Sequence, residues 1–439
     1  MSLEFSTIAL NDIVSLVIDY RGKTPKKLGS DWSENGIRAL SAKNIKTGQI
    51  IREDAIRYVD MELYNKWMKD EIKRNDILIT SEAPFGEVFF WDSDEKIVLS
   101  QRLFGVRCNE NKVDPKFIYF YMTSEMFQWE LQSRATGTTV KGLRQPELLK
   151  CEIQLPNIAN QRKISYILSN IESKINVLKE LNKNLEQLMK CIFEDWFVNF
   201  NYSEDISFKS SELGEIPSNW NVKKLSDVLI TLESGKRPKG GISDIEDGIP
   251  SIGAENILGL GKFNYSKNKL ISHEFFSTLK KGVIQDKDVL LYKDGAQLGR
   301  KSLFMKGFPF DICCINEHVF RLQTNDEINQ FYLYLWLDQE VMTNEIINLN
   351  SNSAQPGINQ NDVKSLPILV PELKIISKFN KIISPMMNQI FDNALEINKL
   401  TKLRDTLLPK LMSGEIDVSK INCDLIIVTF YFYFEILFN

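Results

Sequence analysis

The chain has 439 residues, of which 43% are hydrophobic and 26% charged, and its formal net charge is −4. This composition is ordinary for a soluble globular protein, and the length suggests about three domains. The acidic balance excludes a uniformly basic nucleic-acid binder, so any surface for DNA has to be local.

The start of the chain and its cysteines are typical of a cytoplasmic protein. No basic segment followed by an apolar run opens the chain, so we expect no signal peptide. The six cysteines have no CxxC spacing, and the only two histidines, His273 and His318, lie far apart in the sequence. A zinc site needs four clustered ligands, so we expect no metal site and free thiols in a reducing cytosol.

A repeat divides the sequence into two similar halves. The segment GIRALSAKNI, from Gly36 to Ile45, returns as GIPSIGAENI, from Gly248 to Ile257, with five of ten positions identical. GKTPKK, NDILIT and LKCEIQLP return in the same order as GKRPKG, KDVLLY and VKSLPILVP. The period is far longer than the roughly 20–50 residues of solenoid repeats. The pattern therefore predicts a duplicated domain and a function that suits two similar halves.

Each half begins with a segment that mixes strands and helices. In the first half, residue types predict short strands at Asp76–Thr80, Glu87–Trp91, Ile97–Leu99 and Leu103–Arg107. Asp114 and Pro115 are then typical of the cap and first residue of a helix, which we expect to reach about Ser133. In the second half, Asp326 is the expected cap of a helix to about Asn348. Each half is therefore predicted to contain one α/β domain, within an α+β protein.

A long helix with one apolar seam is predicted after the first α/β segment. Ser169 and Glu172 form a capping box, which predicts that the helix begins there and continues to about Val198. Apolar residues then follow alternating spacings of four and three, which is typical of a coiled-coil seam. The seam positions are Ile171, Ile175, Leu178, Asn182, Leu185, Met189, Ile192 and Trp196.

The second half ends in a matching helix. Ser384, followed by Pro385 at the first helical position, predicts its start. The simplest use of two related seams is to pack on each other, and pseudo-twofold symmetry would make the pair antiparallel. The second seam contains Met386, Ile390, Asn393, Ile397, Leu400, Arg404, Leu407 and Leu411.

Each seam contains one asparagine, and the two asparagines lie at non-equivalent positions of the repeat. If Asn182 faces Asn393, this polar pair fixes the antiparallel register, which is an established role of a buried seam asparagine. The alternative is that each asparagine points to solvent at a local defect of the seam.

No motif predicts catalysis or a cofactor. Gly22-Lys23-Thr24 ends like a phosphate-binding loop, but Val17 stands where that motif needs glycine. The chain has no glycine-rich dinucleotide fingerprint and no Asn/Asp-Pro-Pro-aromatic tetrapeptide of the amino-methyltransferases. Asp94-Glu95-Lys96 is one short charged run, which is usually a solvated turn. We therefore expect neither catalytic residues nor a cofactor.

Two basic turns at equivalent places of the repeat are the strongest candidates for a binding site. Glycine and proline in both turns predict rigid, exposed loops that offer cations to phosphates. The alternative is a pair of solubilising surface loops. The first turn contains Arg21, Lys23, Lys26 and Lys27, and the second contains Lys236, Arg237 and Lys239.

A polar loop in each half, 136–144 and 351–358, is the second candidate. Gly142 is matched by Gly357, while the polar side chains around them change. Such loops suit the reading of different bases in each half, and the alternative is an ordinary flexible linker. The candidate DNA contacts outside the basic turns are Lys43, Asn44, Thr138, Lys141, Arg144, Asn256, Arg300, Lys301 and Gln355.

Three stretches carry a resemblance to a known family. They are WFVNF from Trp196 to Phe200, SELGEIPSNWNVKKLSDV from Ser211 to Val228, and LLPKLMSGEIDV from Leu407 to Val418. In this order they resemble the specificity (S) subunits of Type I restriction–modification systems. The resemblance covers nearly the whole chain, from Ala9 to about Val418.

The resemblance implies two target-recognition domains, 1–156 and 201–371 with its linker, each followed by a conserved helical region, 157–200 and 372–420. Each recognition domain of such a subunit reads one half of a bipartite site in double-stranded DNA. The two antiparallel helices separate the domains as a spacer and dock methyltransferase subunits, of which two are expected. The full complex adds restriction motor-nuclease subunits, and the S subunit itself is not catalytic.

The expected helix length agrees with this arrangement. A helix from Asn170 to Val198 would be ~43 Å long at about 1.5 Å per residue, and one turn of DNA is roughly 34–36 Å. Because the halves differ in sequence, we expect two unlike half-sites. Two other functions stay open: an unrecognised DNA methyltransferase or nuclease, and a coiled-coil scaffold that joins proteins without touching DNA.

The end of the chain departs from the family, whose members usually finish soon after the SGEI stretch. Residues 421–439 are an atypical apolar tail without a counterpart in the first half. Its apolar run, Leu425 to Phe438, is shorter than the ~20 residues of a membrane span, so we expect no membrane association.

Overall fold

The computed structural model describes residues 4–137, 141–202, 207–239, 241, 245–350 and 356–419. The chain forms two compact units. Unit 1 lies within residues 1–174 and 400–439, and unit 2 comprises residues 175–399. Each unit therefore contains one mixed domain together with parts of the two long helices.

The domain of unit 1 is built on two small sheets. The first sheet has the antiparallel order β2-β10-β7-β8, and the second has the order β6-β3-β9, in which β3 and β9 are parallel. All six residues of β7 are buried, so the first sheet lies at the centre of the domain. The strands are β2 (Val14–Asp19), β3 (Ile37–Leu40), β6 (Arg57–Val59), β7 (Asp76–Ser81), β8 (Phe85–Trp91), β9 (Ile97–Leu99) and β10 (Leu103–Cys108). Two further pairs are β1 (Ser6–Ala9) with β11 (Glu152–Leu155) and β4 (Ile45–Lys46) with β5 (Gln49–Ile50).

The domain of unit 2 repeats both sheets. Its first sheet has the order β15-β21-β18-β19, and its second has the order β17-β16-β20, again with one parallel pair. Each strand has its counterpart at the same place in unit 1, so the predicted domain duplication is confirmed at the level of strand order. The strands are β15 (Leu229–Ser234), β16 (Ile249–Ile252), β17 (Leu270–Ile271), β18 (Asp288–Tyr292), β19 (Lys301–Phe304), β20 (Cys314–Ile315) and β21 (Val319–Thr324). The remaining pairs are β12 (Phe208–Ser211) with β13 (Gly214–Pro217) and β14 (Asn221–Lys224) with β22 (Pro367–Val370).

The four strands predicted in the first half are confirmed, but each predicted helix that follows is two helices. Asp114 caps α3 (Pro115–Thr123), as predicted, and α4 (Glu125–Ser133) begins anew because Ser124 adopts an extended backbone. In the second half α9 (Gln330–Asp338) and α10 (Glu340–Asn348) are divided in the same way. The predicted cap at Asp326 is wrong, because the side chain of Asn329 accepts the hydrogen bond of the first turn.

Short helices connect these elements. They are α1 (Leu10–Ile13), α2 (Met61–Trp67) and α5 (Gln145–Leu149) in unit 1, and α7 (Leu225–Val228), α8 (His273–Ser277) and α11 (Gln360–Ser365) in unit 2. Short 3-10 turns follow Pro25 and Ser41 in unit 1 and Gly253 in unit 2. None of the helices among the described residues is both long and apolar enough to cross a membrane.

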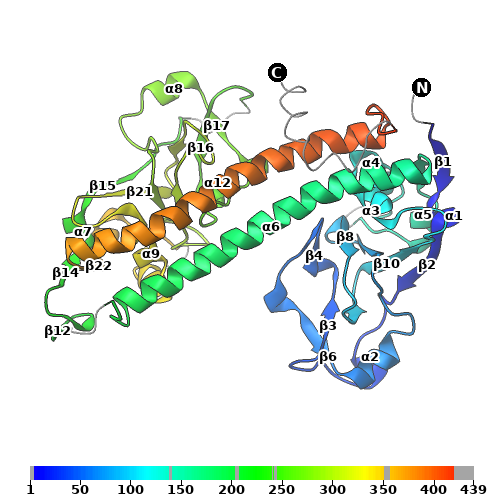
Figure 1. Cartoon of the computed structure of the whole chain (residues 1–439), viewed down its shortest axis with the longest axis horizontal. Coiled ribbons are helices and arrows are strands. Elements are labelled where there is room, and N and C mark those ends of the chain that lie inside the picture. The colour runs from blue at the N-terminus through cyan, green and yellow to red at the C-terminus, as the bar shows by residue number, and fades with distance from the viewer. Residues whose placement is uncertain are drawn as a thin grey trace. The chain divides into compact units, whose positions relative to one another are not determined.

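The two long helices are α6 (Ile158–Phe197) and α12 (Leu373–Met412), each of 40 residues (Figure 1). Both predicted starts are wrong. Ser169 lies inside α6, which begins after Asn157 because the Asn157 side chain accepts a hydrogen bond from the Asn160 amide.

Pro385 lies inside α12 rather than at its first position. An interior proline costs a helix roughly 3 kcal/mol, but this ring is exposed to solvent. Phe379 and Ile383, upstream of the proline, are fully buried in unit 2. Burial of each such side chain stabilises by about 1.5–3 kcal/mol, so packing keeps the chain helical through the proline.

Within unit 2 the helices pair in the predicted register. The side-chain amide of Asn393 donates to Oδ1 of Asn182 at 2.7 Å, and the amide of Asn182 donates to the carbonyl of Ile390 at 3.2 Å. Both asparagines are buried, which excludes the alternative that they point to solvent. Further along, Phe193 of α6 contacts Phe379 of α12, so the two helices are antiparallel.

The predicted seam residues line this contact. In unit 2 Ile175, Leu178, Met189 and Ile390 are buried, and Leu185 and Ile397 are partly buried. In unit 1 Ile171 is buried, Leu400 is partly buried, and Arg404 lies 3.8 Å from Glu172.

An aromatic cluster attaches the end of α6 to the second domain. Phe197 lies 4.8 Å from Phe379 and 4.9 Å from Tyr332 between ring centroids, and it also contacts Trp220. Offset and edge contacts of this kind add about 0.5–1.5 kcal/mol per pair to the burial itself. The motifs WFVNF and SELGEIPSNW therefore act as packing motifs in the core of unit 2.

The asparagine pair gives a stability prediction. Replacing Asn182 with leucine leaves the amide of Asn393 buried without its acceptor, although Gln389 still donates to its oxygen. We expect the free energy of unfolding to fall by about 1–3 kcal/mol. Replacing both asparagines with leucine should recover most of this loss, because no buried amide is then unpaired. Urea denaturation measures the effect.

The control variant is Lys183→Leu, which changes an exposed neighbour on the same helix. Losses in the double variant that equal the sum of the two single losses would contradict a coupled pair.

Candidate nucleic-acid interface

The repeated sequence GIRALSAKNI/GIPSIGAENI forms the same turn in both domains. Oδ1 of Asn44 accepts a hydrogen bond from the Ser41 amide at 3.1 Å, and Oδ1 of Asn256 accepts one from the Gly253 amide at 3.1 Å. Both asparagines are only 1% exposed. They hold the turn after β3 and β16, and because their side chains are buried we leave them out of the interface.

The first basic turn divides into structural and exposed cations. Arg21 is bound to Asp19 at 2.8 Å and to the carbonyl of Leu143 at 3.1 Å. Lys23 donates to the carbonyl of Trp67 at 2.6 Å, and burial lowers its pKa below the ordinary lysine value. The cations that this turn presents to solvent are therefore Lys26 and Lys27.

The sequence did not indicate which cations are structural, because the groups that bind Arg21 and Lys23 lie outside the basic run. Asp19 belongs to the preceding strand β2, and Trp67 ends helix α2, more than 40 residues away. Lys27 is exposed and donates to the carbonyl of Gly22 at 2.8 Å, which keeps its ammonium group on the turn.

Backbone hydrogen bonds bring the polar loop of unit 1 to the same surface as this turn. The amide of Leu143 donates to the carbonyl of Ser81, and the amide of Ser81 donates to the carbonyl of Arg102. The bond from Arg21 to Leu143 joins the basic turn to this group. On either side of the buried Leu143, Lys141 and Arg144 are exposed. The predicted contact Thr138 lies outside the described residues.

The second domain assembles the same loops. Its basic turn begins at Gly235, whose amide donates to the carbonyl of Asn316 at 3.1 Å. Any side chain at this glycine would meet the carbonyl of Ile315, 1.7 Å from an ideal Cβ. The polar loop is tied to the β18 end, because Ile358 donates to the carbonyl of Lys293 at 2.9 Å.

The cations of this turn are exposed, as predicted for a phosphate-binding loop. They are Lys236, Arg237 and Lys239, and Arg237 lies 3.7 Å from Glu317. Arg300 is exposed as well. The predicted contact Gln355 lies outside the described residues.

Lys301 has no place in an interface. All four residues of its strand, β19, are buried, and the Lys301 side chain is 4% exposed and donates to the hydroxyl of Thr343. Burial lowers the pKa of Lys301 to about 8. The prediction of Lys301 as a DNA contact is wrong because its strand is buried on both faces. Such a strand has no alternation of apolar and polar residues that would show which side chains are exposed.

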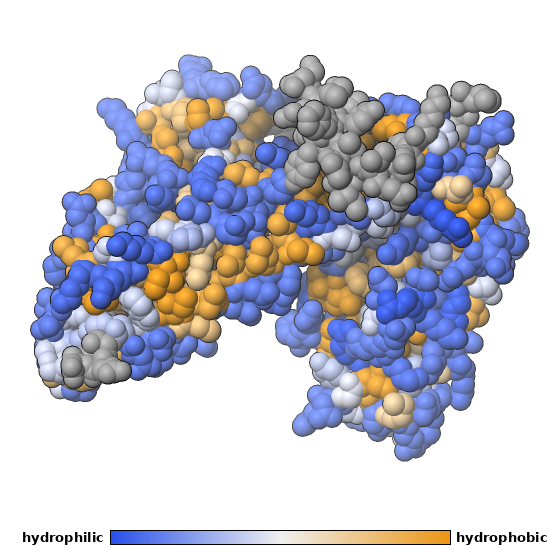
Figure 2. Space-filling view, viewed as in Figure 1, coloured by the Kyte–Doolittle hydropathy of each residue, from blue (hydrophilic) through white to orange (hydrophobic). Residues whose placement is uncertain are grey.

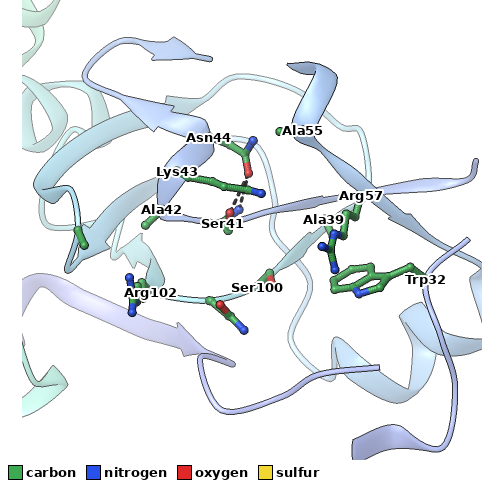
Figure 3. Close-up of a pocket in the computed structure, with 12 residues that line it drawn as sticks. Trp32, Ala39, Ser41, Ala42, Lys43, Asn44, Ala55, Arg57, Ser100 and Arg102 are labelled. Atoms are coloured by element: carbon green, nitrogen blue, oxygen red, sulfur yellow. Dashed lines mark hydrogen bonds between the residues drawn. The ribbon is translucent and has the colours of Figure 1, made fainter. Parts of the chain in front are cut away.

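A pocket of about 290 Å³ lies beside these loops in unit 1 (Figure 3). Three exposed cations, Lys43, Arg57 and Arg102, and the indole of Trp32 line it, together with Gln101. The Arg57 guanidinium lies 5.2 Å from the centre of the Trp32 ring. In Figure 3, Arg102 lies at the end of the pocket opposite Trp32.

Of these residues, only Lys43 was a candidate from the sequence. Arg57 comes to the pocket because β6 pairs with β3, which places Arg57 opposite Ala39. Arg102 has a left-handed backbone, with φ of 63°, between β9 and β10. Neither the strand pairing nor this backbone conformation has a short sequence signal.

Comparison with known proteins identifies the family. The model of the Type I restriction modification DNA specificity domain matches the chain twice, at residues 3–187 and 217–405. The chain belongs to the family of Type I restriction–modification specificity subunits. The resemblance drawn from the sequence motifs is thereby confirmed, as is the fold of two specificity domains with two long helices.

Curated relatives match over most of their length. The Type I restriction enzyme MjaIX specificity subunit of Methanocaldococcus jannaschii is 24% identical over 373 residues, covering 84% of this chain and 82% of the relative. The HindI specificity subunit of Haemophilus influenzae is also 24% identical, covering 88% of this chain and all of the relative. The fold is similar to the crystal structure of the S subunit from M. genitalium, with a TM-score of 0.59 at 17% identity, over 93% of this chain and 96% of that one.

Within the described residues, the specificity subunit contains no group of three or more histidine, cysteine, aspartate or glutamate side chains that could hold a metal ion. The buried cysteines are poor nucleophiles, because burial raises the pKa of both Cys108 and Cys313 to about 12.

Lys301 supports a prediction on stability. Its folded pKa of about 8 is lower than the ordinary value of 10.5, so below pH 8 protonation favours the unfolded chain. We expect Lys301→Met to raise the free energy of unfolding at pH 7 by on the order of 2 kcal/mol. The gain should shrink between pH 8 and 10.5, where the unfolded lysine still binds its proton and the folded lysine has lost it.

Urea denaturation at pH 7 and pH 10 measures this difference, with the exposed Lys280→Met as control. A gain that is equal at both pH values would contradict the assignment to a buried ammonium group.

Proposed function

We propose that this specificity subunit reads a bipartite, asymmetric site in double-stranded DNA, one half with the loops of each domain. The observation that carries the proposal is a backbone attachment that occurs in both domains and carries different side chains. The amides of Leu143 and Ile358 donate to the carbonyls of Ser81 and Lys293, whose own amides donate to the carbonyls of Arg102 and His318. A shared backbone presents the loops of both domains to the same kind of ligand, and different side chains suit two unlike half-sites.

The exposed cations of the loops are the proposed phosphate contacts. They are Lys26, Lys27, Lys141 and Arg144 in unit 1, and Lys236, Arg237, Lys239 and Arg300 in unit 2. In a chain of net charge −4, these cations give the loops a local positive charge that attracts DNA phosphates. Arg21 and Lys23 would then act indirectly, by holding the first turn in shape.

The partner subunits are inferred from the family and from one surface. The relatives are named as specificity subunits of Type I restriction enzymes. We place this subunit in such a complex, together with two methyltransferase subunits and the restriction motor-nuclease subunits. We expect the complex to work in the cytoplasm. Three apolar side chains of α6, Val177, Leu181 and Leu188, are 63%, 40% and 47% exposed. Figure 2 shows hydrophobic residues among the polar ones on one face of the molecule, and we propose that a methyltransferase subunit covers these three side chains of α6.

The subunit is proposed to be non-catalytic. The buried thiols with raised pKa values offer no nucleophile. The partner subunits then carry out modification and cleavage. The two long helices set the spacing between the half-sites.

The test of the function uses the subunit assembled with its methyltransferase subunits. We expect the complex to protect a two-part sequence of DNA and to bind with an affinity that falls steeply with salt. Lys26→Ala/Lys27→Ala should weaken binding to all sequences alike and reduce the slope of log K against log salt by about 2, since each phosphate contact contributes roughly 0.9. Filter binding at several salt concentrations measures the slope.

The matched control is Lys66→Ala/Lys112→Ala. Both lysines belong to unit 1 and have partners away from the loops, Glu62 for Lys66 and the carbonyl of Asp12 for Lys112. An unchanged slope in the first variant would remove the basic turn from the interface. A wild-type complex that protects no particular sequence would refute the function.

A further inference from the structure

Four positions around the pocket of unit 1 have exact structural counterparts in unit 2. The amide of Ser100 donates to the carbonyl of Leu40, and the amide of Asn316 donates to the carbonyl of Ile252, at the same place of the repeated sheet. Positions 101 and 102 therefore correspond to 317 and 318. The asparagine turn is shared by both domains and aligns position 43 with position 255. The strand β6 pairs with β3 as β17 pairs with β16, and this pairing aligns position 57 with position 269.

The side chains at these positions differ in charge. Unit 1 has Lys43, Arg57, Gln101 and Arg102, which are three cations and one amide. Unit 2 has Glu255, Lys269, Glu317 and His318. Glu255 is paired with Lys269 at 2.6 Å, and Glu317 lies 3.3 Å from His318. Two carboxylates thus stand where the first domain has a cation and a neutral amide.

The charge of the basic turns, unlike that of the pocket positions, is the same in both domains. The turn of unit 1 presents Lys26 and Lys27, and the turn of unit 2 presents Lys236, Arg237 and Lys239, so both domains keep cations there. Phosphates are the same in every half-site, and a surface that binds them has no reason to change its sign. Base edges differ between half-sites, and a surface that reads them has to change.

Resting on the proposed function, we propose that positions 43, 57, 101 and 102, with their counterparts 255, 269, 317 and 318, are the base-reading positions of the two domains. The donors Arg102, Lys43 and Arg57 suit the acceptors N7 and O6 of guanine in the major groove. The carboxylates of Glu255 and Glu317 suit the exocyclic amino group of cytosine or adenine. They would repel a phosphate at the same place.

The side chains of unit 1 are available for this role. Lys43, Arg57, Gln101 and Arg102 are exposed, and Arg102 is held loosely by Glu82 at 3.5 Å. Figure 3 shows Lys43, Arg57 and Arg102 reaching the same hollow from separate segments of the chain. Asn44, in contrast, is buried: its side-chain oxygen accepts from the Ser41 amide at 3.1 Å, and its amide donates to the carbonyl of Arg52 at 3.3 Å.

The experiment exchanges the reading positions in one domain only. The variant Lys43→Glu/Arg57→Lys/Gln101→Glu/Arg102→His is assembled with the methyltransferase subunits. Bound fragments are selected from a DNA library and sequenced, so that the base preference at every position of both half-sites is measured. We expect the preference for guanine to change or fall by about 10-fold or more in one half-site, because one bidentate contact supplies roughly that much discrimination. The preferences in the other half-site should stay the same.

Two further variants keep the test decisive. Lys43→Glu is compared with Lys46→Glu, the same charge change three residues away on an exposed side chain outside the pocket, and only the first should alter a base preference. Arg102→Gln, at one exposed side chain, replaces the fourfold variant if that variant does not fold. Unaltered preferences in both half-sites would overturn the reading positions while the wild-type selection still supports DNA recognition, whereas a wild-type complex without any preference would overturn the proposed function itself.

Discussion

The hydrogen bond between Asn182 and Asn393 fixes the register of α6 against α12 in unit 2. Each unit contains a part of α6 and a part of α12, because α6 leaves unit 1 after Lys174 and α12 enters it at Leu400. A shift of either helix along the other would bring the wrong side chains to the domain of unit 2. Apolar seam residues tolerate such shifts, whereas a buried amide has one partner with good geometry. The pair therefore supplies specificity where the apolar seam supplies most of the stability.

The duplication separates the features that both domains share from those in which they differ. The features held in common are in the backbone: the strand order of the two sheets, the asparagine turn after β3 and β16, and the hydrogen bonds that attach the polar loop. The features that differ are the exposed side chains on those loops. A scaffold with fixed hydrogen bonds allows this, because an exposed side chain can be replaced at a cost usually within about 0.5 kcal/mol. New specificities can then arise without any change in the fold.

The sequence predicted those parts of the fold that rest on strong local or symmetric patterns. The strand Ile97–Leu99 was predicted with its exact bounds because three apolar residues between polar ones leave little choice. Symmetry predicted the antiparallel direction of the helices, and the pairing of Asn182 with Asn393 was predicted by matching the one asparagine of each apolar seam. The helix starts at Ser169 and Ser384 were wrong because each local cap competes with the burial of apolar residues upstream, and the burial is larger.

The candidate site was predicted less well, for a related reason. Arg21 and Lys23 belong to a basic run in the sequence, but Asp19 and Trp67 hold them in the structure, and Lys301 is buried by a strand covered on both faces. Conversely, Arg57 and Arg102 reach the pocket through strand pairing and an unusual backbone angle, which no short motif records. The residue type shows only that a side chain is a cation. The tertiary contacts decide whether that cation is bound within the protein or is exposed to a ligand.

The acidic balance of the whole chain fits a subunit that must discriminate. A uniformly basic protein binds any DNA tightly, because phosphates supply most of the affinity and carry no sequence information. The net charge of −4 lowers this background, and at the proposed reading positions Glu255 and Glu317 would add a repulsion that only a suitable base edge relieves. Specificity then depends on the difference between a half-site that satisfies these groups and one that leaves them unpaired. For a protein that has to find a few sites among many, that difference matters more than total affinity.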